Sequence, residues 1–171
     1  VAAGAEAAFE DVHGWTKDHF GVRSTDPAET TENVELVRAS RYGQTEMAAE
    51  LLRRYANPDS FDPAKKRSAL HAACKHRHVE IVRMLITAGA NVELQTLDGS
   101  GMRALHFAAL SGSLEAVKLL LQAHADPAAA NADGRNAAGV ARDHRDVQAL
   151  LYERLAAGSA ATGTCFPSAE L

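Results

Sequence analysis

The chain has 171 residues, a formal net charge of −4 and 46% hydrophobic residues, enough for one folded domain. Its two cysteines, Cys74 and Cys165, exclude a disulfide framework and predict an intracellular, reducing compartment, either cytoplasmic or inside an organelle. No apolar run approaches the roughly 18 to 20 residues of a membrane span, so we expect no direct membrane insertion.

Charge is distributed unevenly along the chain. Residues 1–35 hold eight acidic and two basic residues, residues 36–92 hold five and ten, and residues 93–171 hold nine and six. Basic character therefore belongs to the second of these regions. The acidic overall balance argues against nonspecific nucleic-acid binding, and the short run Lys65-Lys66-Arg67 does not reverse it, so we expect no nucleic-acid partner.

Residues 1–30 are predicted to form an N-terminal extension or capping helix. Apolar and small residues recur at helical spacing around the one tryptophan: Phe9, Val12, Trp15, Thr16 and Phe20. Such a helix either covers the chain's own first helices or docks on a partner. Asp26-Pro27 followed by Glu29 then predicts a helix start. Since Val1 is not an initiator Met, the chain is either processed or part of a longer product.

Two segments of the chain read nearly alike at a spacing of 35 residues. Leu70-His71 recurs as Leu105-His106, and Val79-Glu80 recurs as Leu114-Glu115. A fixed period between about 20 and 50 residues indicates stacked supersecondary units. Fainter copies precede and follow these two, with Leu36 as one landmark and Val147 as another, so we count four units.

The segments Ser68-Ala69-Leu70-His71 and Arg103-Ala104-Leu105-His106 resemble the T-P-L-H signature of the ankyrin repeat, whose unit is about 33 residues. The resemblance implies an all-α ankyrin-repeat solenoid of about four helix pairs with short β-hairpin-like fingers. The predicted repeat domain covers 31–158, with a flexible tail at 159–171. Its repeats are expected at about 31–61, 62–97, 98–132 and 133–158, the outer two degenerate as terminal units need to be.

Turn and cap residues mark the expected helices in chain order. Gly43 separates the two helices of the first repeat, and Ser68 is predicted to be the N-cap of the next helix. Arg77 occupies the helix–helix turn where the family often has glycine. If this position needs a left-handed backbone, arginine costs more free energy than glycine would, so we expect a looser turn. Gly112 keeps the glycine in the third repeat, and 147–155 is expected to close the stack.

Candidate catalytic and metal-binding residues are few. Cys74, His76 and His78 have zinc-ligand chemistry, but on a helix His76 would point away from the other two, so no metal site is predicted. The resemblance implies that His71 and His106 hydrogen-bond the backbone of adjoining turns. No nucleophile triad has local support and no phosphate-binding loop occurs, so we expect no enzyme activity and no cofactor.

The resemblance further implies a concave groove lined by the fingers and by the outward positions of the first helices. These positions are Arg38, Arg41, Tyr42, Lys65, Lys66, Lys75, His76, Met102, Arg103, Phe107, Leu110 and Ser111. We hypothesise a noncatalytic protein–protein interaction module, an adaptor or scaffold that binds an acidic and apolar segment of another protein. Arg41, Lys66 and Lys75 would steer that segment, and Phe107 and Leu110 would anchor it.

Other interpretations stay open at this point. Phe107, Leu110 and Met102 could instead pack on the chain's own tail or N-terminal helix. The protein could be a structural or assembly subunit of a large multi-protein complex, possibly organellar, held through its N- and C-terminal extensions. A third hypothesis is an enzyme or metal protein built around Cys74 and the histidines.

Overall fold

The computed structural model describes residues 27–161, so the predicted helix around Trp15 and residues 162–171 of the predicted tail lie outside the described part. Within this range the chain is helical and no strand forms, which confirms the predicted all-α class. The helices are α1 (Pro27–Tyr42), α2 (Thr45–Arg53), α3 (Ala69–Lys75), α4 (Val79–Thr87), α5 (Ala104–Ser111), α6 (Leu114–Gln122), α7 (Ala137–Val140) and α8 (Arg145–Ala161).

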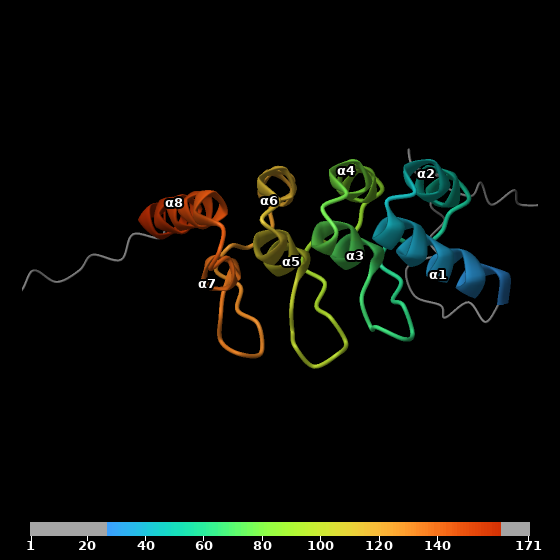
Figure 1. The fold of residues 1–171 in the computed structure, drawn as a ribbon, viewed down its shortest axis with the longest axis horizontal. Coiled ribbons are helices and arrows are strands. Elements are labelled where there is room, and N and C mark those ends of the chain that lie inside the picture. The colour runs from blue at the N-terminus through green and yellow to red at the C-terminus, as the bar shows by residue number, and fades with distance from the viewer. Residues whose placement is uncertain (1–26, 162–171) are drawn as a thin grey trace, which may run out of the picture.

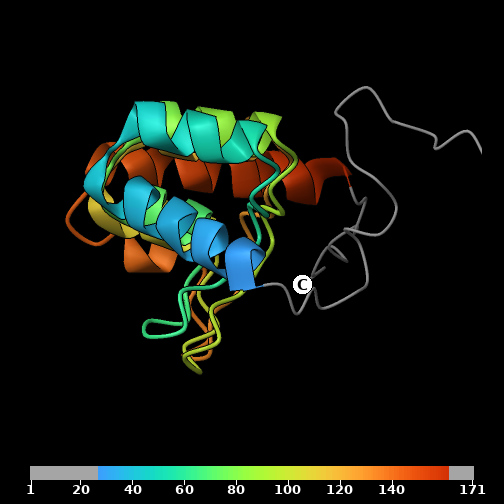
Figure 2. The same ribbon diagram turned by 90° about the vertical axis from the view of Figure 1, so that its right-hand side faces the viewer.

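The helices form two parallel rows, which Figure 1 shows side by side. The inner row contains α1, α3, α5 and α7, each packed on the next, and the outer row contains α2, α4, α6 and α8. Each inner helix pairs with the outer helix that follows it in sequence. This is the predicted solenoid of four helix pairs. Viewed along the stack, the loops between pairs project from the inner row, away from the outer helices (Figure 2).

The core lies between the two rows and explains their sequences. In α3 every residue from Ala69 to Cys74 is buried, and its small alanines let neighbouring helices approach closely. The outer helices are amphipathic: α4 buries Ile81, Val82 and Leu85, which lie on one face of a helix. Burial of each such side chain stabilises the fold by about 1.5–3 kcal/mol relative to exposure.

The helices at the two ends of the stack extend beyond the predicted repeat domain. Helix α1 begins at Pro27, which confirms the helix start predicted at Asp26-Pro27 and lies before the predicted repeat boundary at residue 31, and α8 continues to Ala161, inside the predicted tail. Helix α7 is a single turn, Ala137–Val140, whose N-cap Asn136 accepts a hydrogen bond from the Gly139 N–H at 2.9 Å. A terminal unit has a neighbour on one side only, so a short helix of small residues is sufficient there.

The first three helix–helix turns share one backbone conformation. Gly43 has φ of 72°, Arg77 has 63° and Gly112 has 70°, all left-handed. The left-handed requirement considered for Arg77 is therefore confirmed. The expected loosening is not seen, because the backbone of Arg77 matches that of the two glycines.

The loops between pairs form the predicted hairpin-like fingers. In each finger a backbone hydrogen bond of 2.9 Å joins the two sides: Asp62 N to Arg67 O, Thr96 N to Met102 O, and Asn131 N to Arg135 O. Neighbouring fingers are also bonded, because the Leu97 N–H donates to Lys66 O and the Ala132 N–H to Ser100 O, both at 3.0 Å. The fingers therefore stand as a connected row.

No helix within residues 27–161 is long and apolar enough to cross a bilayer.

Candidate functional site

The two signature histidines hold the fingers in place. His71 accepts a hydrogen bond at Nδ1 from the Ser68 N–H (3.1 Å) and donates from Nε2 to Leu94 O (2.9 Å). His106 repeats this with the Arg103 N–H (3.2 Å) and Arg135 O (3.1 Å). The backbone role implied by the resemblance is confirmed. Each ring links the start of an inner helix to a neighbouring loop.

Burial keeps both imidazoles neutral. It lowers the pKa of His71 to about 4, although the carbonyl of Leu94 acts in the opposite direction. Burial also lowers the pKa of His106. A neutral ring is required by the geometry, because Nδ1 can accept a hydrogen bond only when it carries no proton. These two histidines are structural.

The structure separates Cys74 from the two histidines that follow it. Cys74 is fully buried, and burial raises the pKa of its thiol, whereas His76 is exposed. The expectation that His76 points away from His78 is wrong, since their rings stack with centroids 6.3 Å apart. The reason is that α3 ends at Lys75, so helical spacing does not apply beyond it. Among the described residues no group of three or more metal-ligating side chains gathers.

Phe107 is buried, so its predicted outward position is wrong. Its side chain is 2% exposed and meets the ring of His71 edge-on, with centroids 5.5 Å apart. The guanidinium of Arg67 covers the ring at 5.0 Å from its centroid. Phe107 therefore fills the junction between the second and third repeats, where burial of an aromatic ring is favourable.

Two further predicted groove residues are engaged within the fingers. Met102 is half-buried and its carbonyl accepts from the Thr96 N–H. Arg103 pairs with Glu93 at 3.1 Å and donates to Ala130 O at 3.2 Å. Both residues hold the second finger in place rather than facing outward.

Six predicted residues gather at the C-terminal ends of the inner helices, on a surface that we call the end strip. They are Arg41, Tyr42, Lys75, His76, Leu110 and Ser111. Tyr42 is 65% and Leu110 52% exposed. The Ser111 hydroxyl donates to Cys74 O at 2.9 Å, which joins the end of α5 to the end of α3. Large exposed apolar groups of this kind often mark contact sites.

The charge of the end strip is positive and only partly neutralised. Arg41 pairs with Asp62 at 2.6 Å, whereas within residues 27–161 no carboxylate pairs with the exposed Lys65 or Lys75. Partial burial and the like charges of Arg67, Lys65 and Arg41 lower the pKa of Lys75. A carboxylate placed here would relieve that repulsion.

The pKa of His76 is lowered in the same direction, by partial burial and by the neighbouring charges of Lys75, His78, Arg41 and Lys65. The exposed Lys66, on the first finger, adds to the positive charge of this region. The end strip and the first finger therefore form one cationic surface.

Ion pairs occur on three of the outer helices, α2, α4 and α6. Acids and bases three or four residues apart pair there: Glu50 with Arg53 and Arg54, Glu80 with Arg83, and Glu115 with Lys118. Among the described residues, Lys118 on α6 thus has a carboxylate partner, unlike Lys75 of the end strip.

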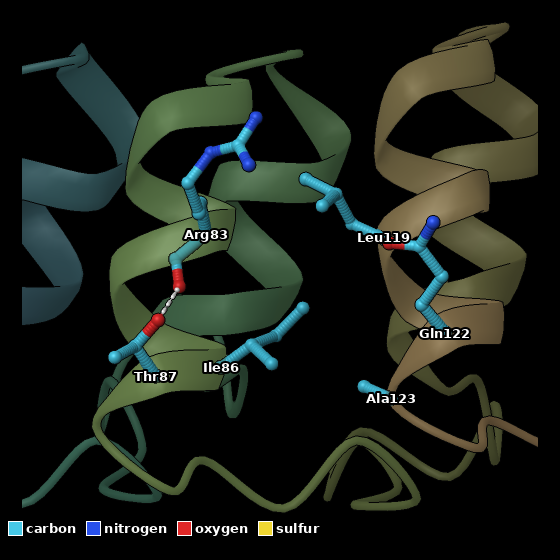
Figure 3. Close-up of a pocket in the computed structure, with 6 residues that line it drawn as sticks. All are labelled: Arg83, Ile86, Thr87, Leu119, Gln122 and Ala123. Carbon is cyan, nitrogen blue, oxygen red and sulfur yellow. Dashed lines mark hydrogen bonds between the residues drawn. The ribbon is translucent and has the colours of Figure 1, made fainter.

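Two shallow hollows lie on the surface of the described residues. The first, of about 220 Å³, opens between α4 and α6 (Figure 3) and is lined by Arg83, Ile86, Thr87, Leu119, Gln122 and Ala123. The second, of about 370 Å³, is lined by Thr31, Val34, Glu35 and Arg38 of α1. The predicted groove residue Arg38 therefore lines this second hollow rather than the end strip.

Sequence reasoning missed two residues that the fold brings to this region. Leu97 is 59% exposed in the second finger, and Arg67 joins the cationic group while covering Phe107. An apolar residue directly before the Asp98-Gly99 turn was the available signal for Leu97, since apolar groups are unusual in exposed turns.

Comparisons with known proteins agree with the architecture. A family model described as "Ankyrin repeats (3 copies)" matches residues 36–131. The B-cell lymphoma 3 protein homolog of Mus musculus is 31% identical over 93% of this chain and 40% of its own length. Ankyrin repeat and SOCS box protein 16 of Homo sapiens is 35% identical over 56% of this chain and 20% of its length.

Some of the similar proteins have enzyme names. The palmitoyltransferase ZDHHC13 of Homo sapiens is 35% identical over 62% of this chain, but the match covers only 17% of that protein. The chain thus spans less than half the length of each of these curated relatives.

Proposed function

The chain belongs to the ankyrin repeat family and is a protein–protein interaction module, and from this premise we propose that it is a noncatalytic adaptor. Its end strip holds an acidic segment of another protein that also carries apolar side chains. One observation carries the proposal. Lys75, at the end of α3, and the neighbouring Lys65 have no carboxylate partner within residues 27–161, and the exposed Tyr42 and Leu110 lie at the ends of the flanking helices α1 and α5.

The roles within the strip follow from side-chain chemistry. Lys75 attracts carboxylates and raises the association rate, and Leu110 supplies apolar contact area. Because Arg41 is already paired with Asp62, it contributes less charge to a partner than the sequence suggested. Phe107 packs between the second and third repeats, beneath the surface of the strip, and makes no partner contact.

A synthetic peptide of 20 residues with several glutamates and leucines tests this function on the full chain. Fluorescence anisotropy should show salt-sensitive binding, which Lys75→Glu weakens at least about fivefold, because reversing one close charge costs on the order of 1 kcal/mol. Leu110→Ala should weaken it as well.

Lys118→Glu is the matched control, since it makes the same charge change on the outer helix α6. It should leave binding unchanged. Equal losses in Lys75→Glu and Lys118→Glu would show that net charge alone governs binding, and the end strip would then not be the site.

Alternatively, the protein is a structural or assembly subunit of a large multi-protein complex, possibly organellar, held through its N- and C-terminal extensions, residues 1–30 and 159–171. Purification of the full chain and of its Lys75→Glu variant from the native source separates the two proposals. Loss of a salt-sensitive partner from the variant favours the adaptor, and unchanged co-purifying subunits favour the assembly role.

The free, buried thiol of Cys74 supports the further proposal of an intracellular, reducing compartment.

A further inference from the structure

The end strip is narrow, and its width limits what can lie on it. In α3 every residue before Lys75 is buried, and in α5 every residue before Leu110 is buried. Each of these helices therefore offers only its last residue or two to a partner. A helix with its side chains is about 10–12 Å wide and would extend beyond these terminal residues.

Repeat spacing sets the distance between successive parts of the strip. Tyr42, Lys75 and Leu110 belong to α1, α3 and α5, which pack side by side in the inner row (Figure 1). Packed helix axes lie about 8–10 Å apart. The strip thus presents an aromatic side chain on α1, a cation on α3 and an aliphatic side chain on α5. Neighbouring members of this series are about 10 Å apart.

We propose that the partner segment binds as an extended chain in the polyproline II conformation that crosses α1, α3 and α5, with every third residue facing the strip. This conformation has three residues per turn and rises about 3.1 Å per residue, so three residues span about 9 Å, one repeat. The recognised motif is an apolar residue, two spacer residues, Glu or Asp, two spacer residues and a second apolar residue. The inference rests on the proposed function and adds the conformation and spacing of the partner.

Each contact in this arrangement pairs groups of complementary chemistry. The central carboxylate meets the Lys75 ammonium, whose like-charged neighbours are Arg41, Lys65 and Arg67. One apolar side chain packs on the Tyr42 ring and the other on Leu110, which are both more than half exposed. A helical partner, rising about 1.5 Å per residue, would instead need about seven residues per repeat.

Three synthetic peptides of equal length and composition test the spacing against the full chain. The first contains Leu-Ser-Ser-Glu-Ser-Ser-Leu, the second places the same leucines next to the glutamate, and the third places each leucine seven residues from it. We expect the first to bind at least about tenfold more tightly than the others, with that preference lost in Leu110→Ala.

Each alternative result has a distinct meaning. Equal, salt-sensitive binding of all three peptides that Lys75→Glu weakens would overturn the spacing and leave the proposed function standing. Tightest binding by the third peptide would overturn the extended conformation in favour of a helix. Binding no stronger than that of a peptide with glutamine in place of glutamate would overturn the proposed function together with this inference.

Discussion

The imidazole of His78 lies against the helix–helix turn of the preceding repeat at Gly43. A Cβ added at Gly43 would lie 2.6 Å from His78 Cε1, and His78 Nε2 donates to the carbonyl of Arg41 at 3.2 Å. The third turn repeats the arrangement, since a Cβ at Gly112 would overlap the ring of His144. The second turn has Arg77 instead of glycine, and the residue before α6 is the smaller Ser113.

Gly43→Ala tests this interlock between repeats. A left-handed alanine costs about 1–2 kcal/mol, and displacing His78 adds to that cost. We expect the free energy of unfolding, measured by urea denaturation, to fall by about 2–4 kcal/mol. Gly89→Ala is the control, because φ is 82° there but nothing lies within 4 Å of an added Cβ. Equal losses in both variants would mean that the histidine contact contributes nothing.

Arg77→Gly should have the opposite sign. Glycine adopts the left-handed φ of 63° without the steric cost that arginine incurs, so unfolding should require about 0.5–1 kcal/mol more. Arg83→Gly, the same substitution inside α4, should cost about 1 kcal/mol, as glycine does in helix interiors. A destabilised Arg77→Gly protein would show that the Arg77 side chain makes a favourable contact larger than the backbone strain.

Stability should depend on pH through His71. Its folded pKa of about 4 is below the ordinary 6.5, so its contribution is complete above pH 6.5 and is lost as the pH falls towards 4. The loss is up to about 3 kcal/mol, with His106 adding to it in the same direction. The carboxyls of Asp62 and Asp98 titrate below this window, because hydrogen bonds and arginine partners lower their pKa values despite burial.

The measurement is the urea midpoint between pH 4 and 8, compared in the parent protein and in His71→Asn. The variant should be less stable at pH 7.5 and show a shallower pH dependence, whereas the exposed His124→Asn should keep the parent slope. Should His71→Asn not fold, the NMR shifts of His71 in the parent decide the question. A ring that titrates near pH 6.5 would contradict the prediction.

Phe107 and Leu110 should separate core packing from partner contact. Phe107→Ala removes a buried ring and should destabilise the protein by about 3–5 kcal/mol. Leu110→Ala removes a side chain that is 52% exposed, so the free energy of unfolding should change by less than about 1 kcal/mol. Calorimetry measures both, and a large loss for Leu110→Ala would place it in the core instead of on the strip.

The amino-acid sequence alone was sufficient to predict the repeat architecture. The recurrence of Leu70-His71 as Leu105-His106 predicted stacked helix pairs, and the resemblance to the ankyrin repeat implied the hydrogen-bonding role of the two histidines. These properties depend on local spacing, and local spacing is readable because each unit repeats the same backbone geometry.

Only the tertiary structure decided which of the candidate groove residues face outward. Phe107 turns inward because His71 and Arg67 of the preceding repeat offer a contact that the helical period does not reveal. Arg41 and Arg103 are engaged by Asp62 and Glu93, residues of other elements. The exposed strip is what remains after these contacts are made, and they join residues 10 to 40 positions apart whose pairing no local pattern encodes.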